Sequence, residues 1–428
     1  MQEILLVHAL VIDPLNDYVG VRDLAIKDGV FTRPEELHSP IRLDMRGLVV
    51  CPGFTDVHVH LRDPGQIYKE DLQSGTAAAA AGGFTSILAM PNTVPAMDSP
   101  EGVRDIHRRA ANAPVHVYQA ACFSKGRLGQ ELSPMEALAS AGTPAFSDDG
   151  STTQSDALME EAMRRAAALG LPIIDHCEET SISKPGVMHR GFVSMEMELP
   201  GQPRVAEEII VERDIRLSRK TGCRVHLQHL SSGGSVKMLR EAKRQGVKVT
   251  GEATPHHLFL TDEACRKYGT NAKMAPPLRE EVDRQALIQA LQDGTIEMIA
   301  TDHAPHTAEE KAHDWASAPF GIVGIETVVP LCISRLYHPG LLSLMQLVSL
   351  FTVGPRRLLN LPIGSLDIGE PADLTVLDLE KNHTIDTSKF RSRGRNCPYN
   401  GWECTGAVHS TFLSGKHIVG WGIKKLSS

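Results

Sequence analysis

Histidine and aspartate side chains alternate with apolar residues in the stretch from Phe54 to Leu61. His58 and His60 are separated by one residue, and Asp56 precedes them at the same spacing. Alternate side chains of a β-strand project from one face, so both imidazoles are expected to point the same way. Two neighbouring imidazole nitrogens can bind a metal ion, and a polar strand without metal is the alternative interpretation.

Other strand-like apolar runs also end in residues that bind metals. These ends carry Asp148, Asp149, His176, His229 and Asp302. In a parallel barrel the carboxyl ends of the strands meet at one face, where catalytic residues collect. Imidazole and carboxylate form a Zn²⁺-type ligand set that needs no thiolate. The histidines and aspartates together exceed the needs of one zinc ion, which favours two ions sharing a carboxylate.

Strands and helices that alternate along the chain must position these side chains. The expected strands cover residues 49–59, 85–90, 115–121, 144–147, 172–176, 224–229, 248–253 and 297–301. Helices are expected over residues 70–81, 100–111, 134–140, 156–169, 204–220, 235–245, 284–291, 326–336 and 343–359. This alternation predicts an α/β fold, a (β/α)8 TIM barrel.

Short β-like pieces lie on both sides of the barrel region. They cover residues 4–7, 10–12 and 24–27 before it, and residues 372–378, 406–413 and 418–420 after it. Because the two ends have similar character, we predict that together they form one small β domain. The expected division is residues 1–50 and 361–428 for the β domain and residues 51–360 for the barrel.

The composition is that of a soluble globular protein, with 42% hydrophobic and 22% charged residues and a net charge of −8. The negative charge argues against nucleic acid or an anionic membrane as a partner. No stretch approaches the ~20 apolar residues of a membrane span. The eight cysteines are scattered without a Cys-x-x-Cys pair, and the N-terminus lacks a basic leader, which predicts a cytoplasmic setting.

Longer strings recur at the ends of the expected strands. They are HLRDPG at 60–65, MPNT at 90–93, SDDG at 147–150, PHH at 255–257, PPLR at 276–279, TDHAPH at 301–306 and PFG at 319–321. From about residue 48 to 378 the chain resembles the class I bacterial dihydroorotases of the amidohydrolase superfamily. The resemblance implies zinc-dependent, reversible cyclisation of N-carbamoyl-L-aspartate to L-dihydroorotate in de novo pyrimidine biosynthesis.

The resemblance also implies one or two zinc ions and assigns their ligands. The ligands would be His58, His60, Asp149, His176, His229 and Asp302. Many relatives bridge their metals with a carboxylated lysine, but no lysine lies near this strand end, so Asp149 is the expected bridge. Asp148 is expected to face the other way as a turn residue. Asp302 is the expected catalytic residue, which carries a proton between the attacking water and the leaving nitrogen.

Substrate contacts follow from the same resemblance. They would be His60, Arg62, Asn92, Ala275, His306, Phe320 and Gly321. Arg62, Asn92 and His306 would bind the substrate carboxylate, and we call these three residues the carboxylate clamp. An arginine suits this role because its guanidinium can form a bidentate fork.

One of these positions departs from the family pattern. Ala275 stands where the family usually has asparagine, so one side-chain hydrogen bond, worth about 0.5–1.5 kcal/mol, is missing. Either a water molecule fills the gap or Asn271 reaches it from upstream.

Several polar residues near the strand ends receive supporting roles. Glu178 and Glu252 are expected to orient histidines, and His303 is expected to form structural hydrogen bonds. Residues 306–319 have no clear helical or strand pattern. They are either a lid over the site or an ordinary surface loop.

Two other functions stay open. One is a different cyclic-amide hydrolase, such as a hydantoinase or allantoinase, although that group usually bridges its metals with carboxylated lysine. The other is an inactive dihydroorotase-like subunit that scaffolds aspartate transcarbamoylase; such subunits have lost metal ligands, whereas this chain retains each of them. The expected partner is a small-molecule substrate, and the sequence leaves a homodimer and a transcarbamoylase complex open.

Overall fold

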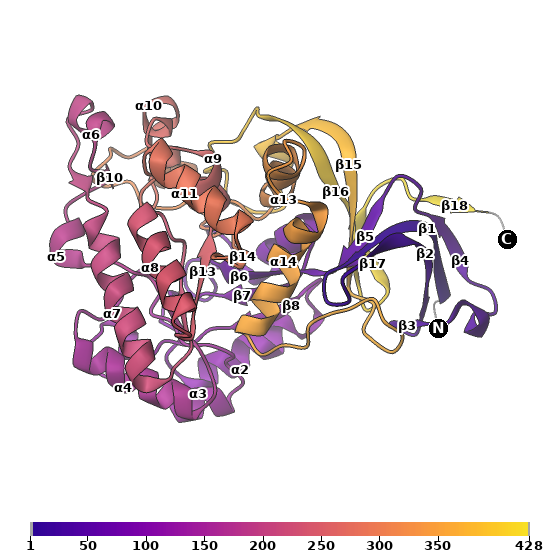
Figure 1. Cartoon of the computed structure of the whole chain (residues 1–428), viewed down its shortest axis with the longest axis horizontal. Coiled ribbons are helices and arrows are strands. Elements are labelled where there is room, and N and C mark those ends of the chain that lie inside the picture. Colours follow the sequence, from indigo (N-terminus) through magenta and orange to yellow (C-terminus); the bar gives the residue numbers. More distant parts are fainter. Residues whose placement is uncertain (1–2, 427–428) are drawn as a thin grey trace.

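The computed structural model describes residues 3–426 and consists of a barrel and a β-sheet that lie side by side (Figure 1). The barrel strands are β6 (Phe54–Val59), β7 (Phe84–Ala89), β8 (His116–Gln119), β9 (Ile173–Asp175), β12 (Val225–Leu227), β13 (Val249–Ala253) and β14 (Met298–Ile299). They pair in parallel in the orders β6-β7-β8 and β14-β13-β12-β9. Bridges through Phe146 join β8 to β9, and the bridge between Val59 and His303 closes the ring. The predicted (β/α)8 barrel is confirmed.

Helices cover the outside of the barrel close to where they are predicted. They are α1 (Leu72–Ala81), α2 (Pro100–Arg109), α3 (Met135–Ser140), α4 (Asp156–Ala168), α7 (Val205–Thr221), α8 (Gly233–Arg244), α11 (Glu281–Gln292), α13 (Val328–Cys332) and α14 (Leu344–Leu358). Several helices begin at a serine whose side chain accepts a hydrogen bond from a backbone N–H of the first turn, among them Ser99, Ser155 and Ser343. Such caps satisfy backbone donors that the first turn leaves free.

Short elements interrupt the alternation at the carboxyl end of the barrel. Between β9 and α7 lie α5 (Thr180–Ser183), β10 (Met188–His189), α6 (Phe192–Glu196) and β11 (Gly201–Gln202). After β13 come α9 (Pro255–Phe259) and α10 (Ala264–Tyr268), and after β14 comes α12 (Ala308–Lys311). Residues 306–319, which show no clear helical pattern in the sequence, contain α12, and this helix begins at a capping box made by Thr307 and Glu310. One turn of helix is too short to produce a periodic pattern.

Both ends of the chain form one nine-stranded sheet, as predicted. Its strands are β1 (Glu3–Asp13), β2 (Tyr18–Lys27), β3 (Val30–Thr32), β4 (Ile41–Asp44), β5 (Val49–Pro52), β15 (Leu374–Thr384), β16 (Glu403–Leu413), β17 (Lys416–Gly420) and β18 (Lys424–Leu426). β5 joins the two ends because it pairs in parallel with β1 and antiparallel with β15.

Two of the predicted barrel strands differ from the structure. The single strand expected over residues 49–59 is wrong: the chain breaks at Gly53, so β5 belongs to the sheet and β6 to the barrel. An added Cβ at Gly53 would lie 2.1 Å from Thr85 Oγ1, so only glycine fits at this crossing. The strand expected over residues 144–147 is reduced to bridges at Phe146. The domain bounds remain a prediction.

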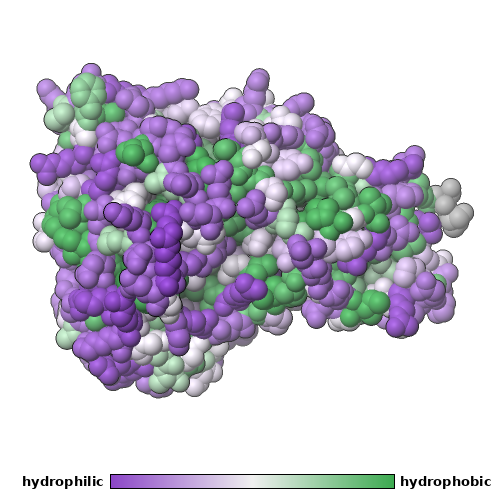
Figure 2. All heavy atoms as spheres, viewed as in Figure 1, coloured by the Kyte–Doolittle hydropathy of each residue, from purple (hydrophilic) through white to green (hydrophobic). Residues whose placement is uncertain are grey.

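The main core lies between the barrel strands and the helices, and a second core lies within the sheet. At the amino end of the barrel the ring of Phe351 in α14 stacks on Phe54 with 5.1 Å between centroids. Figure 2 shows hydrophilic residues over the barrel helices and apolar residues along the seam toward the sheet. Within residues 3–426, no helix is long and apolar enough to cross a membrane.

Candidate metal and substrate site

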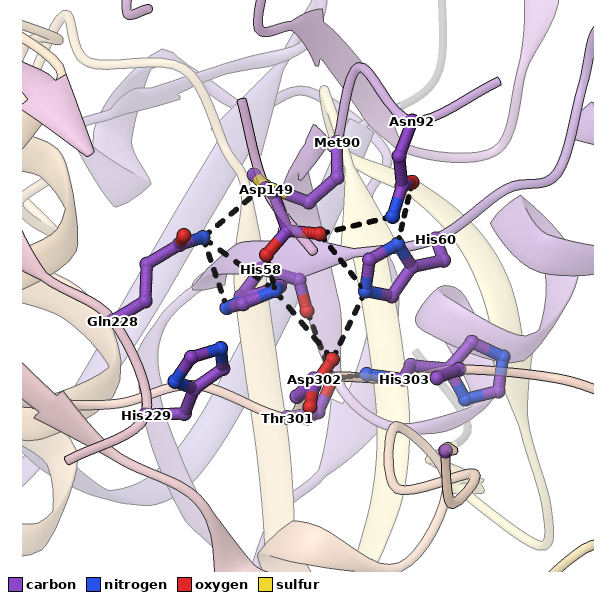
Figure 3. A network of polar contacts seen from close by, with 12 residues as sticks. His58, His60, Met90, Asn92, Asp149, Gln228, His229, Thr301, Asp302 and His303 are labelled. Carbon is purple, nitrogen blue, oxygen red and sulfur yellow. Dashed lines mark hydrogen bonds and ion pairs between the residues drawn. The ribbon is translucent and has the colours of Figure 1, made fainter. Parts of the chain in front are cut away.

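The six residues predicted to bind metal lie together at the carboxyl end of the barrel. His58 lies in β6 and His60 just after it, and the others follow β9, β12, β14 and the bridge at Phe146. All six are buried. Figure 3 shows His58 and His60 between Asp149 and Asp302, with His229 beside His58. The alternation of side chains along β6 therefore brings both histidines to one face.

Two carboxylates lie between the two histidines of β6. His58 Nε2 is 3.2 Å from Asp149 Oδ1 and 3.4 Å from Asp302 Oδ1. His60 Nε2 is 2.9 Å from Asp302 Oδ1 and 3.6 Å from Asp149 Oδ2. Nitrogen and oxygen atoms of these four side chains thus face a common point, an arrangement suited to a cation.

The other two histidines extend this group on its far side. His176 Nδ1 lies 2.9 Å from His229 Nε2. The ligand atoms of Asp149, His176 and His229 lie within 4.8 Å of one another, and so do those of His58, His60 and Asp149. Asp149 therefore belongs to both triads, which fits a carboxylate shared by two ions. Asp148 instead accepts hydrogen bonds from Ser124, whose backbone N–H donates to Asp148 Oδ1 at 3.1 Å.

Two glutamates fix the rings of two of these histidines. His58 Nδ1 donates to Glu252 Oε1 at 2.7 Å, which leaves Nε2 facing the carboxylates. His226 donates to the other oxygen of Glu252 at 3.0 Å. His176 Nε2 donates to Glu178 Oε2 at 3.0 Å, which leaves Nδ1 facing His229. A carboxylate behind a histidine fixes its tautomer and its direction as a metal ligand.

The electrostatics of the group favour a positive ion at its centre. Burial alone would raise the pKa of Asp149, but His58 and His60 hold that pKa well below its usual value. Burial alone would lower the pKa of His58, but Asp149 and Asp302 raise it well above the ordinary value. Burial lowers the pKa of His229 to about 3, helped by the neighbouring histidines His176 and His58. Asp149 and His229 are therefore in the forms that bind a metal, and His58 would release a proton when a metal binds.

Three residues at this site have a strained backbone. The backbone angle φ is 31° at His229, 45° at Asp302 and 56° at Arg62. All three values lie in the left-handed region that residues other than glycine rarely adopt. Such conformations cost about 1–3 kcal/mol each and persist where the surrounding structure imposes them. They turn these side chains inward at the ends of their strands.

A cavity of about 350 Å³ opens beside the metal-ligand group. Its lining includes every predicted substrate contact, namely His60, Arg62, Asn92, Ala275, His306, Phe320 and Gly321. Among the described residues, the lining does not include Asn271, the suggested replacement for the missing asparagine. Glu178, Lys184 and Gln202 also face the cavity, and the last two had no expected role.

The carboxylate clamp connects the cavity to the metal-ligand group. Asn92 accepts a hydrogen bond from His60 Nδ1 at 2.9 Å and donates to Asp149 Oδ2 at 3.0 Å. Arg62 Nη2 lies 3.2 Å from the ring of His306. Burial lowers the pKa of His306 to about 2, with Arg62 as the next cause, so the ring is neutral and donates to Phe320 O at 2.9 Å.

The loop of residues 306–321 is held by two buried lysines that had no expected role. Lys311 Nζ donates to Pro319 O at 2.9 Å and to Gly321 O at 3.0 Å. Lys273 Nζ donates to Trp315 O and Ala318 O, each at 2.5 Å. No sequence signal marks these lysines, because their acceptors are backbone carbonyls that any residue supplies. Whether the loop opens as a lid remains a prediction.

Known proteins resemble this chain in sequence. The sequence model of the amidohydrolase family matches residues 49–418. The chain is 46% identical to a dihydroorotase of Geobacillus sp. (strain WCH70) over 92% of this chain and 94% of that protein. It is 43% identical to a dihydroorotase of Acetivibrio thermocellus over 96% of this chain and 97% of that protein.

Solved structures of related enzymes have the same fold. An L-hydantoinase from Arthrobacter aurescens superposes with a TM-score of 0.89 at 25% identity, covering 100% of this chain and 98% of that one. A dihydropyrimidinase from Brevibacillus agri superposes with a TM-score of 0.87 at 22% identity, covering 98% and 95%. The second likeness concerns the fold alone.

Proposed function

We infer that this chain, which belongs to the amidohydrolase family, is a dihydroorotase. The observation that carries this inference is its 42–46% identity to curated dihydroorotases over most of its length. The reaction is the reversible cyclisation of N-carbamoyl-L-aspartate to L-dihydroorotate. In the hydrolytic direction water adds to the ring amide carbonyl, the bond from that carbon to the ring nitrogen breaks, and the nitrogen receives a proton.

The metal in this proposal is zinc, one or two ions per chain. The ligands would be His58, His60, Asp149, His176, His229 and Asp302, with Asp149 as the bridge. A buried set of imidazoles and carboxylates without thiolate supports this choice. Bound zinc would polarise the amide carbonyl and lower the pKa of water toward neutrality.

Asp302 is the proposed proton carrier. Burial alone would raise its pKa, but His58 and His60 hold the pKa below its usual value, so the carboxylate is ionised and able to accept a proton. It lies between His58 and His60 and also lines the cavity where substrate would sit. The carboxylate clamp would orient the substrate so that the ring amide faces Asp302.

A cytoplasmic location and the assembly state belong to the same proposal. All eight cysteines are buried free thiols, which suits a reducing compartment. A homodimer and a complex with aspartate transcarbamoylase remain predictions, and the mass of the protein in solution, with and without transcarbamoylase, tests both.

One assay tests the proposed function against its alternatives. The purified protein, loaded with zinc, is offered dihydroorotate, hydantoin and allantoin in parallel, before and after treatment with a chelator. We expect turnover of dihydroorotate that disappears on chelation and returns with Zn²⁺. Preference for hydantoin or allantoin would indicate another cyclic-amide hydrolase. A zinc-loaded protein inactive on all three substrates would support the scaffold alternative.

A further inference from the structure

The segment of residues 390–397 lies outside the barrel strands, between a short 3₁₀ helix (Thr387–Lys389) and β16, yet it packs against the carboxyl end of the barrel. An added Cβ at Gly394 would lie 2.8 Å from Pro305 Cβ and 2.6 Å from Val323 Cγ1. A side chain larger than glycine would push the segment away. The segment is therefore fitted closely against the loop that follows β14.

Both the nitrogen and the oxygen of the Asn396 side-chain amide form hydrogen bonds with that loop. Its Nδ2 donates to Ala304 O at 2.9 Å and to Gly321 O at 3.0 Å, and its Oδ1 accepts from His306 N at 3.0 Å. Its own carbonyl accepts from Val323 N at 3.1 Å. Only one orientation of the amide satisfies these partners, because carbonyls accept and an N–H donates.

The three groups bound by the Asn396 side chain all belong to residues that line the substrate cavity. Ala304, His306 and Gly321 face it, whereas Asn396 is not among its lining residues. The three lie close together: an added Cβ at Gly321, where φ is 139°, would lie 2.8 Å from Ala304 Cβ and 3.0 Å from His306 Cδ2. Asn396 thus holds the start of the loop, at Ala304 and His306, and its end, at Gly321, next to the place where the His306 ring lines the cavity.

We propose that Asn396 is a positioning residue of the carboxylate clamp, which sets the place of His306 and so the affinity for the carboxylate of the substrate. This rests on the proposed function, because it takes His306 as a carboxylate contact. Without the Asn396 amide, the carbonyl of Ala304 and the N–H of His306 lose the hydrogen bonds described above, and Gly321 O keeps the one from Lys311. The loop must shift to satisfy the freed groups. A shift of His306 weakens substrate binding while the metal-ligand group stays in place.

The test compares Asn396→Ala and Asn396→Asp with Asn400→Ala in the zinc-loaded full chain. The aspartate keeps the volume of asparagine but has a carboxylate oxygen, which accepts hydrogen bonds, in place of the NH₂ group that donates two. Asn400 is the matched control: it lies in the same region and accepts from Thr387 N at 3.0 Å on the exposed surface. For dihydroorotate hydrolysis we expect the KM of both Asn396 variants to rise about tenfold or more, with kcat within about threefold of wild type. The control should keep both constants, and zinc content should be constant throughout.

A double-mutant cycle shows whether Asn396 acts through His306. In a His306→Ala background, Asn396→Ala should change KM by less than about twofold, because the contact to be positioned is already gone. Additive effects on KM would overturn the proposal.

The remaining outcomes separate this proposal from the proposed function. A wild-type protein that does not hydrolyse dihydroorotate overturns the proposed function. An active wild type whose Asn396 variants keep their KM overturns only the role of Asn396. Insoluble variants, or variants that lose zinc, also overturn it, because they would assign Asn396 to the stability of the fold or of the metal-ligand group.

Discussion

The metal-ligand group and His306 of the carboxylate clamp share one cavity but are positioned by different parts of the molecule. His58 lies in β6, His176 directly follows β9 and Asp302 lies just after β14. Glu252 in β13 fixes the ring of His58, and Glu178, two residues after His176, fixes the ring of His176. His306, in contrast, lies in a loop that Lys273 and Lys311 and the distant segment 390–397 hold in place. On our proposal, turnover therefore depends on groups at the barrel strand ends, where Arg62 and Asn92 also lie, whereas the placement of His306 depends on contacts made from outside the barrel.

Replacing Asp302, the proposed proton carrier, should have the largest effect on turnover. Asp302→Asn keeps the shape of the side chain but removes the acceptor, so kcat should fall by at least the ~10²-fold typical of a lost general base. Steady-state kinetics on the zinc-loaded variant measures this, with circular dichroism to check the fold. Near-normal turnover in a folded variant would remove Asp302 from the proton-transfer step.

Weakening the support of a metal ligand should change metal affinity. Glu252→Gln leaves one acceptor but loses the charge that faces both His58 and His226, so zinc should bind about 10–100-fold more weakly. Competition with a chromogenic chelator measures the affinity. Glu178→Gln is the matched variant and should have a smaller effect, because the Glu178 side chain is 19% exposed and water can replace its contact with His176. Equal zinc affinity in wild type and Glu252→Gln would contradict this role.

A change in the carboxylate clamp should leave the metal in place. Arg62→Lys keeps the charge but loses the planar fork and the hydrogen bond from Nε to Pro305 O at 3.3 Å. We expect KM to rise about tenfold, the equivalent of ~1.4 kcal/mol, with zinc content unchanged. Loss of zinc from this variant would show that the clamp and the metal-ligand group are one unit.

The smallest effect is expected where the family pattern is broken. Ala275→Asn restores a side-chain amide at the cavity wall, so KM should stay constant or fall by no more than about tenfold, ~1.4 kcal/mol. The wild-type enzyme, assayed beside it, is the reference. An inactive wild type that gains activity from this one substitution would mean that the chain has lost catalysis and serves as a scaffold.

The same division explains which features the sequence predicts. The period of two in β6 brings His58 and His60 to one face, and strand ends meet at one end of any parallel barrel, so the candidate ligands follow from local pattern. Asn396 lies 90 positions from His306, and Ser392 lies 322 positions from the buried Glu70 that it contacts. Local periodicity carries no information about such pairs, since they form only when the complete fold brings them together. The strand expected over residues 49–59 is wrong for a related reason, since the close approach of Gly53 to Thr85 is a contact with the next strand that periodicity does not show.

The join between the two ends of the chain has a consequence for biosynthesis. A ribosome delivers the chain from its amino end at about 5–20 residues per second, and folding starts before the chain is complete. A nascent chain that ends at residue 389 already contains the six predicted metal ligands, Arg62 and His306, but it lacks Asn396 and β16. At that stage the proposed zinc ligands have all been synthesised, whereas on our proposal His306 gains its full affinity for the substrate carboxylate only once residues 390–397 have followed them.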